Sequence, residues 1–328
     1  MPETPANPAP DALAPGAPPP APQLGGPEKI AQMIFLGPNG IRAGWRLLIW
    51  ILLVAFFGVI ISVSIHKIPA LAQYQQQPVK GQQEIMTPGS LIVGEGGIVL
   101  ALFLSVLVMS FIERKSFKDY GLPAQGAFGK RFWQGIAFGF ASVSLLMAAI
   151  GALGGFSLGT LALTQSEIVK YGLLYGAGFL LVGFFEEFTF RGYLQATLGS
   201  GIGFWPAAVI LAILFGAAHG GNGGEKSFGL IMAGLYGLFA AFTLSRTGNL
   251  WFAIGDHAAW DWGETYFYST ADSGALAKGH LLNSSFHGPN WLTGGTVGPE
   301  GSYLVFAVVA LTFVAVHFLF PAKKSEAA

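Results

Sequence analysis

The residues best suited to chemistry in this sequence are two adjacent carboxylates followed by an arginine. Residues 183–192 read Gly-Phe-Phe-Glu-Glu-Phe-Thr-Phe-Arg-Gly, which places Glu186 and Glu187 inside an apolar stretch. A carboxylate buried in hydrocarbon is costly unless it is paired. Arg191 follows Glu187 by one helical turn, in the favourable order for an ion pair. We therefore expect a structural Glu187–Arg191 pair, with Glu186 turned about 100° away into a cavity as a general base.

Two further patterns place histidines at helical spacing. Phe215 and His219 are four residues apart at the end of an apolar stretch, and the small residues between them would let a neighbouring helix approach closely. His257 and Asp261 have the same spacing and should face the same way. A His–Asp pair can orient a water, polarise a carbonyl or bind a metal. Each pattern alone equally fits a polar network that only holds helices together.

The remaining histidines carry no comparable pattern. One borders an apolar stretch, two lie in a polar loop and one lies in the last apolar stretch. We assign no role to these residues, which are His66, His280, His287 and His317.

The elements that must position these residues are membrane helices. A hydrocarbon core of ~30 Å needs about 20 residues of helix. The sequence contains about eight apolar runs of this kind, so we predict an all-α, polytopic transmembrane bundle. The runs lie near 44–65, 89–113, 132–155, 169–198, 204–219, 227–246, 249–268 and 302–320. The fourth to seventh carry ionisable groups well inside, whereas the others have almost no interior charge.

The candidate residues fall at similar depths in their helices. With a rise of ~1.5 Å per residue, Glu186, His219, His257 and Asp261 lie roughly 12 to 24 Å from the expected cytoplasmic ends. Four polar side chains from three helices would therefore meet near the middle of the membrane. Polar residues that each served a separate structural role would not need to lie at the same depth. The common depth therefore favours one shared site.

Composition supports the membrane class and narrows the partners. Of the 328 residues 52% are apolar and 10% are charged, against roughly 25% charged in soluble domains, and the mean hydropathy is +0.56. The formal net charge is zero, which argues against a nucleic-acid partner. No cysteine is present, so disulfides and thiolate chemistry are excluded. The expected partners are the lipid bilayer and a substrate, and the oligomeric state is left open.

The chain divides into a core and two tails. Residues 1–28 are rich in Pro and Ala and are expected to form a disordered cytoplasmic tail, as is the short segment 323–328. Residues 29–322 should form the membrane domain. Lys and Arg concentrate on the side that carries both termini, which predicts cytoplasmic termini in an integral membrane protein. The polar, Gly-rich loop 269–301 should then lie on the opposite side, over the helix ends.

The ordered set of motifs resembles a known family. Glu186-Glu187 with Arg191, then Phe215 with His219, then His257 with Asp261 resemble the CAAX protease and bacteriocin-processing (CPBP, or Abi) family of intramembrane endopeptidases, to which the Ras-converting CAAX endopeptidase is related. The resemblance covers about residues 110–265 and includes the turn 113–115 and the segment 119–122. It departs from the eukaryotic pattern at Asp261, where an Asn is usual.

The resemblance implies roles for these residues. Glu186 and His219 would activate a water that attacks a peptide carbonyl, and His257 would stabilise the developing oxyanion. Asp261 would orient His257, because an ionised Asp has no proton to donate. Glu187, Arg191 and Phe215 would support the helix packing.

The resemblance also bears on cofactor and substrate. A metal-free mechanism is favoured, with zinc bound by Glu186, His219 and His257 as the alternative. The substrate would be a peptide or a membrane protein, and the cytoplasmic membrane of a bacterium is the expected location. Two other readings stay open: a non-catalytic immunity or scaffold protein, and a proton-coupled transporter that uses the same polar network.

Overall fold

The computed structural model describes residues 26–37, 40–75, 85–221 and 227–322 and divides into two units, Met1–Arg42 and Ala43–Ala328. In the first unit, helix α1 (Gly26–Phe35) is followed by the antiparallel pair β1 (Leu36–Gly37) and β2 (Gly40–Ile41). The tail predicted for 1–28 lies outside the described residues up to position 25, and α1 already begins at Gly26. The tail predicted for 323–328 also lies outside them.

The second unit is a helix bundle, which confirms the all-α prediction. Its helices are α2 (Ala43–Lys67), α3 (Pro69–Ala72), α4 (Pro88–Glu113), α5 (Lys130–Ala152), α6 (Gln165–Glu187), α7 (Gln195–Ile202), α8 (Phe204–Ala218), α9 (Ser227–Thr247), α10 (Trp251–Trp262), α11 (Asn290–Thr293) and α12 (Leu304–Leu319). Its short 3-10 and π turns are η1 (Phe117–Tyr120), η2 (Phe188–Leu194), η3 (His219–Gly221), η4 (Gly263–Phe267) and η5 (Pro299–Gly301). Its strands are β3 (Ile85–Met86), β4 (Phe156–Ser157), β5 (Leu276–Ala277) and β6 (Ser285–Phe286).

All eight predicted apolar runs are helical. Within the described part of the chain, five helices are long and apolar enough to cross a membrane, and α6, η2 and α7 together make one of them. The helices α8 and α12 are apolar but shorter, and α10 reaches a comparable length only together with η4. These helices make the chain an integral membrane protein.

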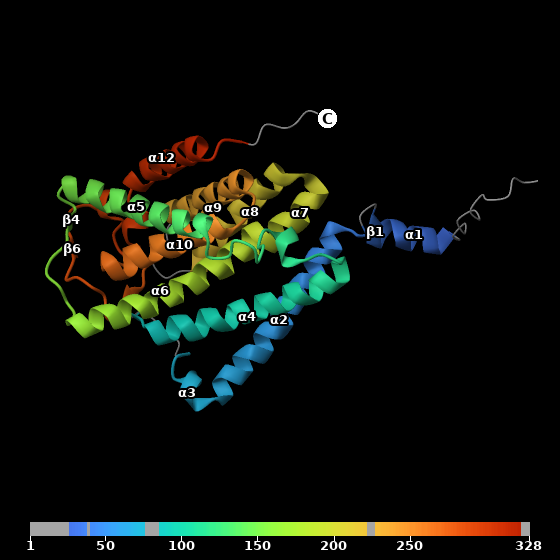
Figure 1. Ribbon diagram of the computed structural model, residues 1–328, viewed down its shortest axis with the longest axis horizontal. Coiled ribbons are helices and arrows are strands. Elements are labelled where there is room, and N and C mark those ends of the chain that lie inside the picture. Colours follow the sequence, from blue (N-terminus) through green and yellow to red (C-terminus); the bar gives the residue numbers. More distant parts are fainter. Residues whose placement is uncertain (1–25, 38–39, 76–84, 222–226, 323–328) are drawn as a thin grey trace, which may run out of the picture. The chain divides into compact units, whose positions relative to one another are not determined.

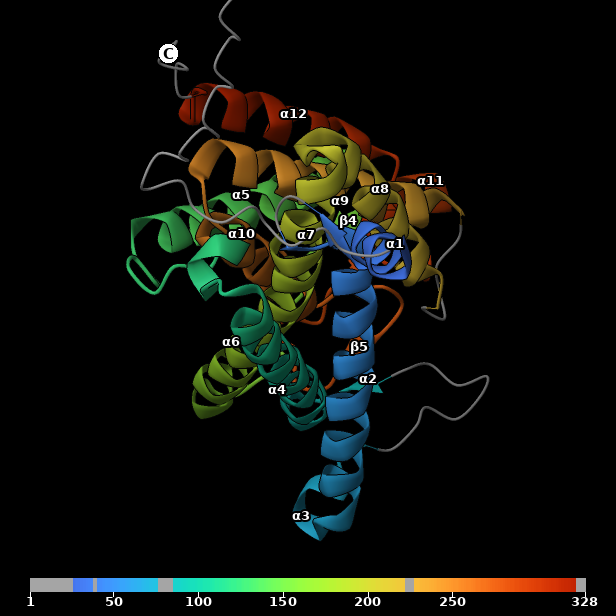
Figure 2. The same cartoon turned by 90° about the vertical axis from the view of Figure 1, so that its right-hand side faces the viewer.

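The helix α10 lies at the centre of the packing. It contacts α5, α6 and α9, while α4 runs beside α6 and α12 covers α5 and α9 (Figures 1 and 2). The closest approach is between α10 and α5, where Gly135 and Gly139 face Gly255. A Cβ at any of these glycines would overlap a backbone carbonyl oxygen of the other helix. Small residues let two helix backbones touch in this way.

One end of α4 is fixed by a buried ion pair. Arg46 from α2 lies 2.7 Å from Glu113, and the Tyr193 hydroxyl of η2 donates to the same carboxylate at 2.7 Å. The Tyr193 ring also stacks on Trp50, with 5.0 Å between ring centroids. This network ties α2, α4 and η2 together at the turn 113–115, which the sequence analysis had noted only for its family resemblance.

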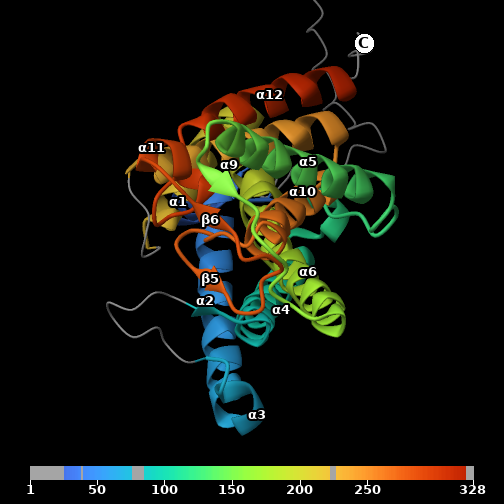
Figure 3. The same cartoon turned by 90° about the vertical axis from the view of Figure 1, so that its left-hand side faces the viewer.

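The loop 269–301 lies at the opposite end of α4 from this ion pair, and also at the N-terminal end of α6. Its strand β5 pairs in parallel with β3, and β6 pairs antiparallel with β4. The loop is therefore attached to the segments that precede the N-terminal ends of α4 and α6 (Figure 3). The Tyr175 hydroxyl of α6 donates to the carbonyl of Lys278 in the loop at 2.8 Å. The loop is thereby held against the bundle close to the polar helices.

The α5–α10 contact should tolerate no added volume. We expect Gly139→Ala to lower the free energy of unfolding by about 1–3 kcal/mol, because the new methyl group would overlap the Asp256 carbonyl. Thermal unfolding of the purified protein in detergent measures the change. Gly58→Ala in α2 is the matched control, since nothing lies within 4 Å of a Cβ there. Equal stability of the two variants would contradict the close-packing argument.

Candidate active site

The site begins with the two adjacent carboxylates at the end of α6. The Glu187 side chain is fully buried, whereas 20% of the Glu186 side chain is exposed. Directly after them the chain forms the π-turn η2 instead of continuing as a regular α-helix. A single π-turn within a longer helix is frequent at functional sites. The neighbouring glutamates therefore point into different environments, as their helical spacing predicted.

Glu187 is the hub of the polar network. Its Oε1 lies 3.3 Å from the Arg191 guanidinium and accepts a hydrogen bond from Nδ1 of His257 at 2.8 Å. The predicted Glu187–Arg191 ion pair is present. The contact with His257 was not predicted, because it depends on how α6 and α10 cross. His257 thus contacts Glu187 through Nδ1, while Asp261, the residue expected to orient it, lies 3.6 Å from its Nε2.

Arg191 is held on both sides. Its Nε donates to the carbonyl of Gly237 in α9 at 3.2 Å, and the guanidinium carbon lies 4.1 Å from the centre of the Phe215 ring. A cation over an aromatic face is attracted by the ring quadrupole. Phe215 thus lies directly against the charged group of this network.

His257 lies among three carboxylates. Its Nδ1 faces Glu187, and its Nε2 lies 3.4 Å from Oε2 of Glu186 and 3.6 Å from Oδ2 of Asp261. A carboxylate accepts hydrogen bonds, so this arrangement suits a ring in which both nitrogens carry a proton. Such a ring can donate a hydrogen bond to developing negative charge.

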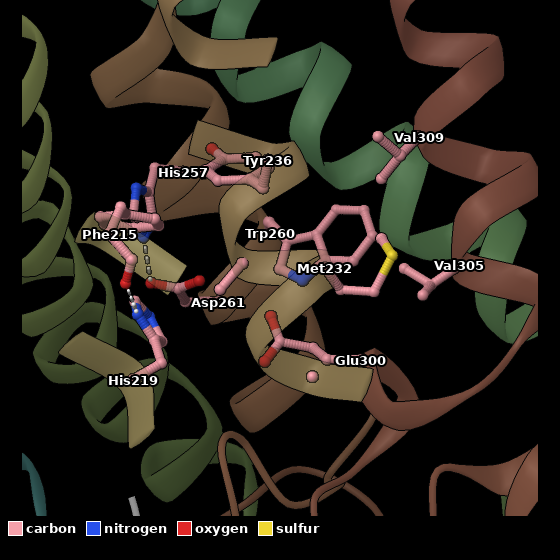
Figure 4. Close-up of a pocket in the computed structure, with 12 residues that line it drawn as sticks. Phe215, His219, Met232, Tyr236, His257, Trp260, Asp261, Glu300, Val305 and Val309 are labelled. Carbon is pink, nitrogen blue, oxygen red and sulfur yellow. Dashed lines mark hydrogen bonds and ion pairs between the residues drawn. The ribbon is translucent and has the colours of Figure 1, made fainter. Parts of the chain in front are cut away.

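His219 lines a small cavity together with two residues of this group, His257 and Asp261. Its Nδ1 is 2.8 Å from the carbonyl oxygen of Phe215. A carbonyl only accepts, so Nδ1 donates, and Nε2 of the neutral ring keeps a lone pair that can accept a proton. His219, His257 and Asp261 line the same cavity and lie on one side of it (Figure 4).

The cavity has a volume of about 60 Å³. A buried water needs roughly 10–15 Å³ of such volume, so several waters fit. Glu186 is not among the residues that line it, and its contact to the group runs through His257. The structure thus brings Glu186, Glu187, His257 and Asp261 into contact, and His219 lines the same cavity as His257 and Asp261.

Three neighbours of the site were missed from the sequence. Tyr236 in α9 packs its ring edge-on to His257 at 5.2 Å between centroids and donates from its hydroxyl to Asp256 at 3.0 Å. Glu300 of the loop lines the cavity. Glu95 of α4 has a buried Oε2 that makes no hydrogen bond, near Glu186. Glu95 could have been found from the sequence, because it is an acidic residue inside an apolar run. It is the interior charge that the description of the run 89–113 as almost free of charge passed over.

The loop also brings a carboxyl group toward the site. Asp272 accepts a hydrogen bond from the Thr265 hydroxyl at 2.9 Å and interacts electrostatically with Glu186 and both site histidines. Burial raises the pKa of the Asp272 carboxyl above its ordinary value, although the Thr265 bond opposes this shift. The loop is therefore part of the electrostatic environment of the site.

The zinc set considered from the sequence was Glu186, His219 and His257. Within the described ranges, no group of three or more His, Asp or Glu residues is arranged to hold a metal ion. Nδ1 of His257 faces Glu187, and Nε2 faces the carboxylates of Glu186 and Asp261.

Comparison with known families agrees with the motifs. A family model described as "Type II CAAX prenyl endopeptidase Rce1-like" matches residues 168–263. This segment contains all the motifs of α6, α8 and α10, and the resemblance predicted from them is confirmed. Over this segment the chain is similar to CAAX-type intramembrane proteases. Searches of the curated proteins and of the solved structures gave no match.

Removing the partner of a buried charge should strongly destabilise the protein. Arg191→Met would leave Glu187 fully buried without its guanidinium, and we expect a loss of about 3–5 kcal/mol in the free energy of unfolding. Thermal or denaturant unfolding in detergent measures this loss. Arg246→Met is the control, because Arg246 is only partly buried where it contacts His317 and Phe242. A small, equal effect of both changes would show that Glu187 does not depend on Arg191.

Proposed function

We propose that this protein is an intramembrane endopeptidase that hydrolyses a peptide bond with a water activated by Glu186 and His219. The observation that carries the proposal is that Glu186 of α6 lies 3.4 Å from His257 of α10, beside a cavity that His219, His257 and Asp261 line. The family match over residues 168–263 supports the same reaction class. Charged groups inside a membrane bundle are costly and are kept where they serve a function.

In the proposed reaction, Glu186 accepts a proton from water as the water oxygen attacks the peptide carbonyl. The C–O bond forms, and the carbonyl π electrons move to the oxygen. His219, through Nε2, hydrogen-bonds the attacking water and helps to orient it. Glu186 then passes its proton to the leaving amine nitrogen as the C–N bond breaks.

His257 has the complementary task. Its Nε2 proton, which faces Glu186 and Asp261 in the free site, would turn to the developing oxyanion. Glu187 fixes the ring through Nδ1 and favours its charged form. Asp261 would keep this charge balanced while Glu186 carries the proton. Glu187, Arg191 and Phe215 are positioning residues in this scheme.

We favour a metal-free reaction over a zinc-dependent one. The reason is that His257 faces carboxylates at both ring nitrogens and so acts as a hydrogen-bond donor. Zinc would instead need a lone pair from this ring. The substrate class is a peptide or a membrane protein, and we place the chain in a bacterial cytoplasmic membrane with both termini in the cytoplasm.

Glu186→Gln is the direct test of the proposed base. The amide is nearly isosteric but cannot accept the proton, so cleavage should fall by about 10²–10⁴-fold while the protein still folds. Cleavage of added peptides by the protein in lipid vesicles measures the effect, and thermal unfolding checks the fold. Glu167→Gln at the exposed start of α6 is the matched control. Full activity of Glu186→Gln would rule out the mechanism and favour a scaffold or transport role.

Metal removal separates the two mechanisms. Incubation with a zinc chelator should leave the rate of peptide cleavage unchanged, because the proposed steps use only protein groups. The wild-type protein is assayed before and after chelation, and its metal content is measured by mass spectrometry. If chelation abolished cleavage and added zinc restored it, the reaction would be zinc-dependent.

A further inference from the structure

The first unit of the chain contains a short amphipathic helix that takes no part in the proposed reaction. In α1, Ile30, Met33 and Ile34 follow one another at the spacing of three and four residues that places side chains on one side of a helix. Gln32 lies about 160° around the helix from Ile30. The helix therefore has an apolar side and a polar side.

The apolar side of α1 is open to its surroundings. Ile30 is 61% exposed and Met33 is 68% exposed. The described residues of this unit, 26–37 and 40–42, comprise the helix and two paired strands of two residues each. These residues are too few to bury an apolar core of their own. Apolar side chains that are exposed together on one surface mark a site of contact with a protein or a membrane.

The length of α1 leads to the same requirement. The helix has 10 residues. An isolated helix shorter than about 12–15 residues is marginal in water, because its first turn is costly to form. Short helices in proteins gain most of their stability when their apolar side is buried. We therefore expect Ile30 and Met33 to lie in an apolar environment when the helix is formed.

The end of α1 is attached to the residue that precedes the first membrane span. The Arg42 amide donates to the Phe35 carbonyl at 2.9 Å, and Nε of Arg42 donates to the Met33 carbonyl at 2.8 Å. A basic side chain often satisfies the free carbonyls in the last turn of a helix in this way. Arg42 is bonded directly to Ala43, the first residue of α2. The last turn of α1 is therefore held close to the start of α2.

The helix that starts at Ala43 is one of the five that are long and apolar enough to cross a membrane. A helix that is apolar on all sides belongs either in a protein core or in lipid. Large apolar side chains of α2 are exposed, which indicates contact with lipid, and they include Leu48, Ile51, Leu52 and Phe56. The covalent link between the units therefore brings the end of α1 to the surface of this lipid phase.

We propose that α1 is a membrane-surface helix that lies in the plane of the lipid headgroups, in the leaflet that α2 enters. Ile30 and Met33 would be immersed by about 5–10 Å, to the boundary of the acyl chains, while Gln32 faces water. The exposed Arg42 at the end of the helix would lie at the level of the lipid phosphates. The partner of this helix side is thus the lipid surface.

Single cysteines can measure this depth, because the chain contains no cysteine of its own. Ile30→Cys, Met33→Cys and Gln32→Cys are each made in the full-length protein, spin-labelled and placed in vesicles of phosphatidylethanolamine and phosphatidylglycerol. Electron paramagnetic resonance measures collisions of each label with oxygen, which concentrates in lipid, and with a water-soluble nickel chelate. We expect the labels at residues 30 and 33 to favour oxygen, at a depth of ~5–10 Å, and the label at residue 32 to favour nickel.

Two further labels supply the reference values. Leu52→Cys in α2 reports a lipid-facing position, since Leu52 is 61% exposed on a membrane span. Gln125→Cys reports water, since Gln125 is an exposed polar residue in the turn between η1 and α5. Thermal unfolding of each labelled protein confirms that the helix bundle is retained.

A matched pair of charge variants tests the apolar side without a label on the changed residue. With the label at residue 30, Met33→Glu should lower the ratio of oxygen to nickel collisions to nearly that at residue 125, because a carboxylate resists immersion in lipid. Gln32→Glu adds the same charge on the other side of the helix and should leave the ratio unchanged. Equal effects of the two changes would contradict the proposed orientation.

Two results would overturn the proposal. If all three α1 labels meet the nickel chelate as freely as residue 125 does, the helix lies in water. If the labels at residues 30 and 33 are shielded from both oxygen and nickel, protein covers this side, and mutual broadening of the labels' spectra would identify a second copy of the chain as the cover. These measurements do not depend on peptide cleavage, so they test α1 independently of the proposed function.

Discussion

The burial of one carboxylate, Glu187, is the constraint on which the site depends. In a membrane bundle its charge is tolerable only because Arg191 and His257 both reach its Oε1. These two partners fix three elements at once, since Arg191 also binds the backbone of α9 and His257 belongs to α10. Glu187 therefore positions the groups around it without facing the cavity itself. Its neighbour Glu186 is left in the more exposed place.

The central helix makes this arrangement rigid. Nearly every residue of α10 is buried, including Asp256, His257 and Asp261. Its backbone touches that of α5 through glycines, so its axis has little freedom to shift. The Tyr236 hydroxyl donates a hydrogen bond to Asp256 on another face of the helix from Asp261. A helix with polar groups on several faces is thus accommodated because each face meets a different partner.

The sequence was sufficient for the helices and for the polar residues that meet between α6 and α10. Apolar runs of about 20 residues leave little choice of structure, and the four-residue spacings identify side chains that share a helix face. The link between Glu187 and His257 was not visible, because it depends on the crossing of two helices. Tyr236 looks like any aromatic residue of an apolar helix, and Glu300 lies in a Gly-rich loop whose position is set by strand pairs with distant segments.

The π-turn η2 has a consequence for how the long span can vary. It lies between α6, which carries the glutamates, and α7, where Ser200 contacts Arg46 of α2. The turn therefore changes the direction in which the side chains of α7 point about the helix axis relative to those of α6. In a continuous α-helix, rotating one end to suit its neighbours would rotate the other by the same angle. With a wider turn between them, each half can keep its own rotational setting. The end that contacts α2 and the end that carries the glutamates are thereby free to diverge in sequence without disturbing one another.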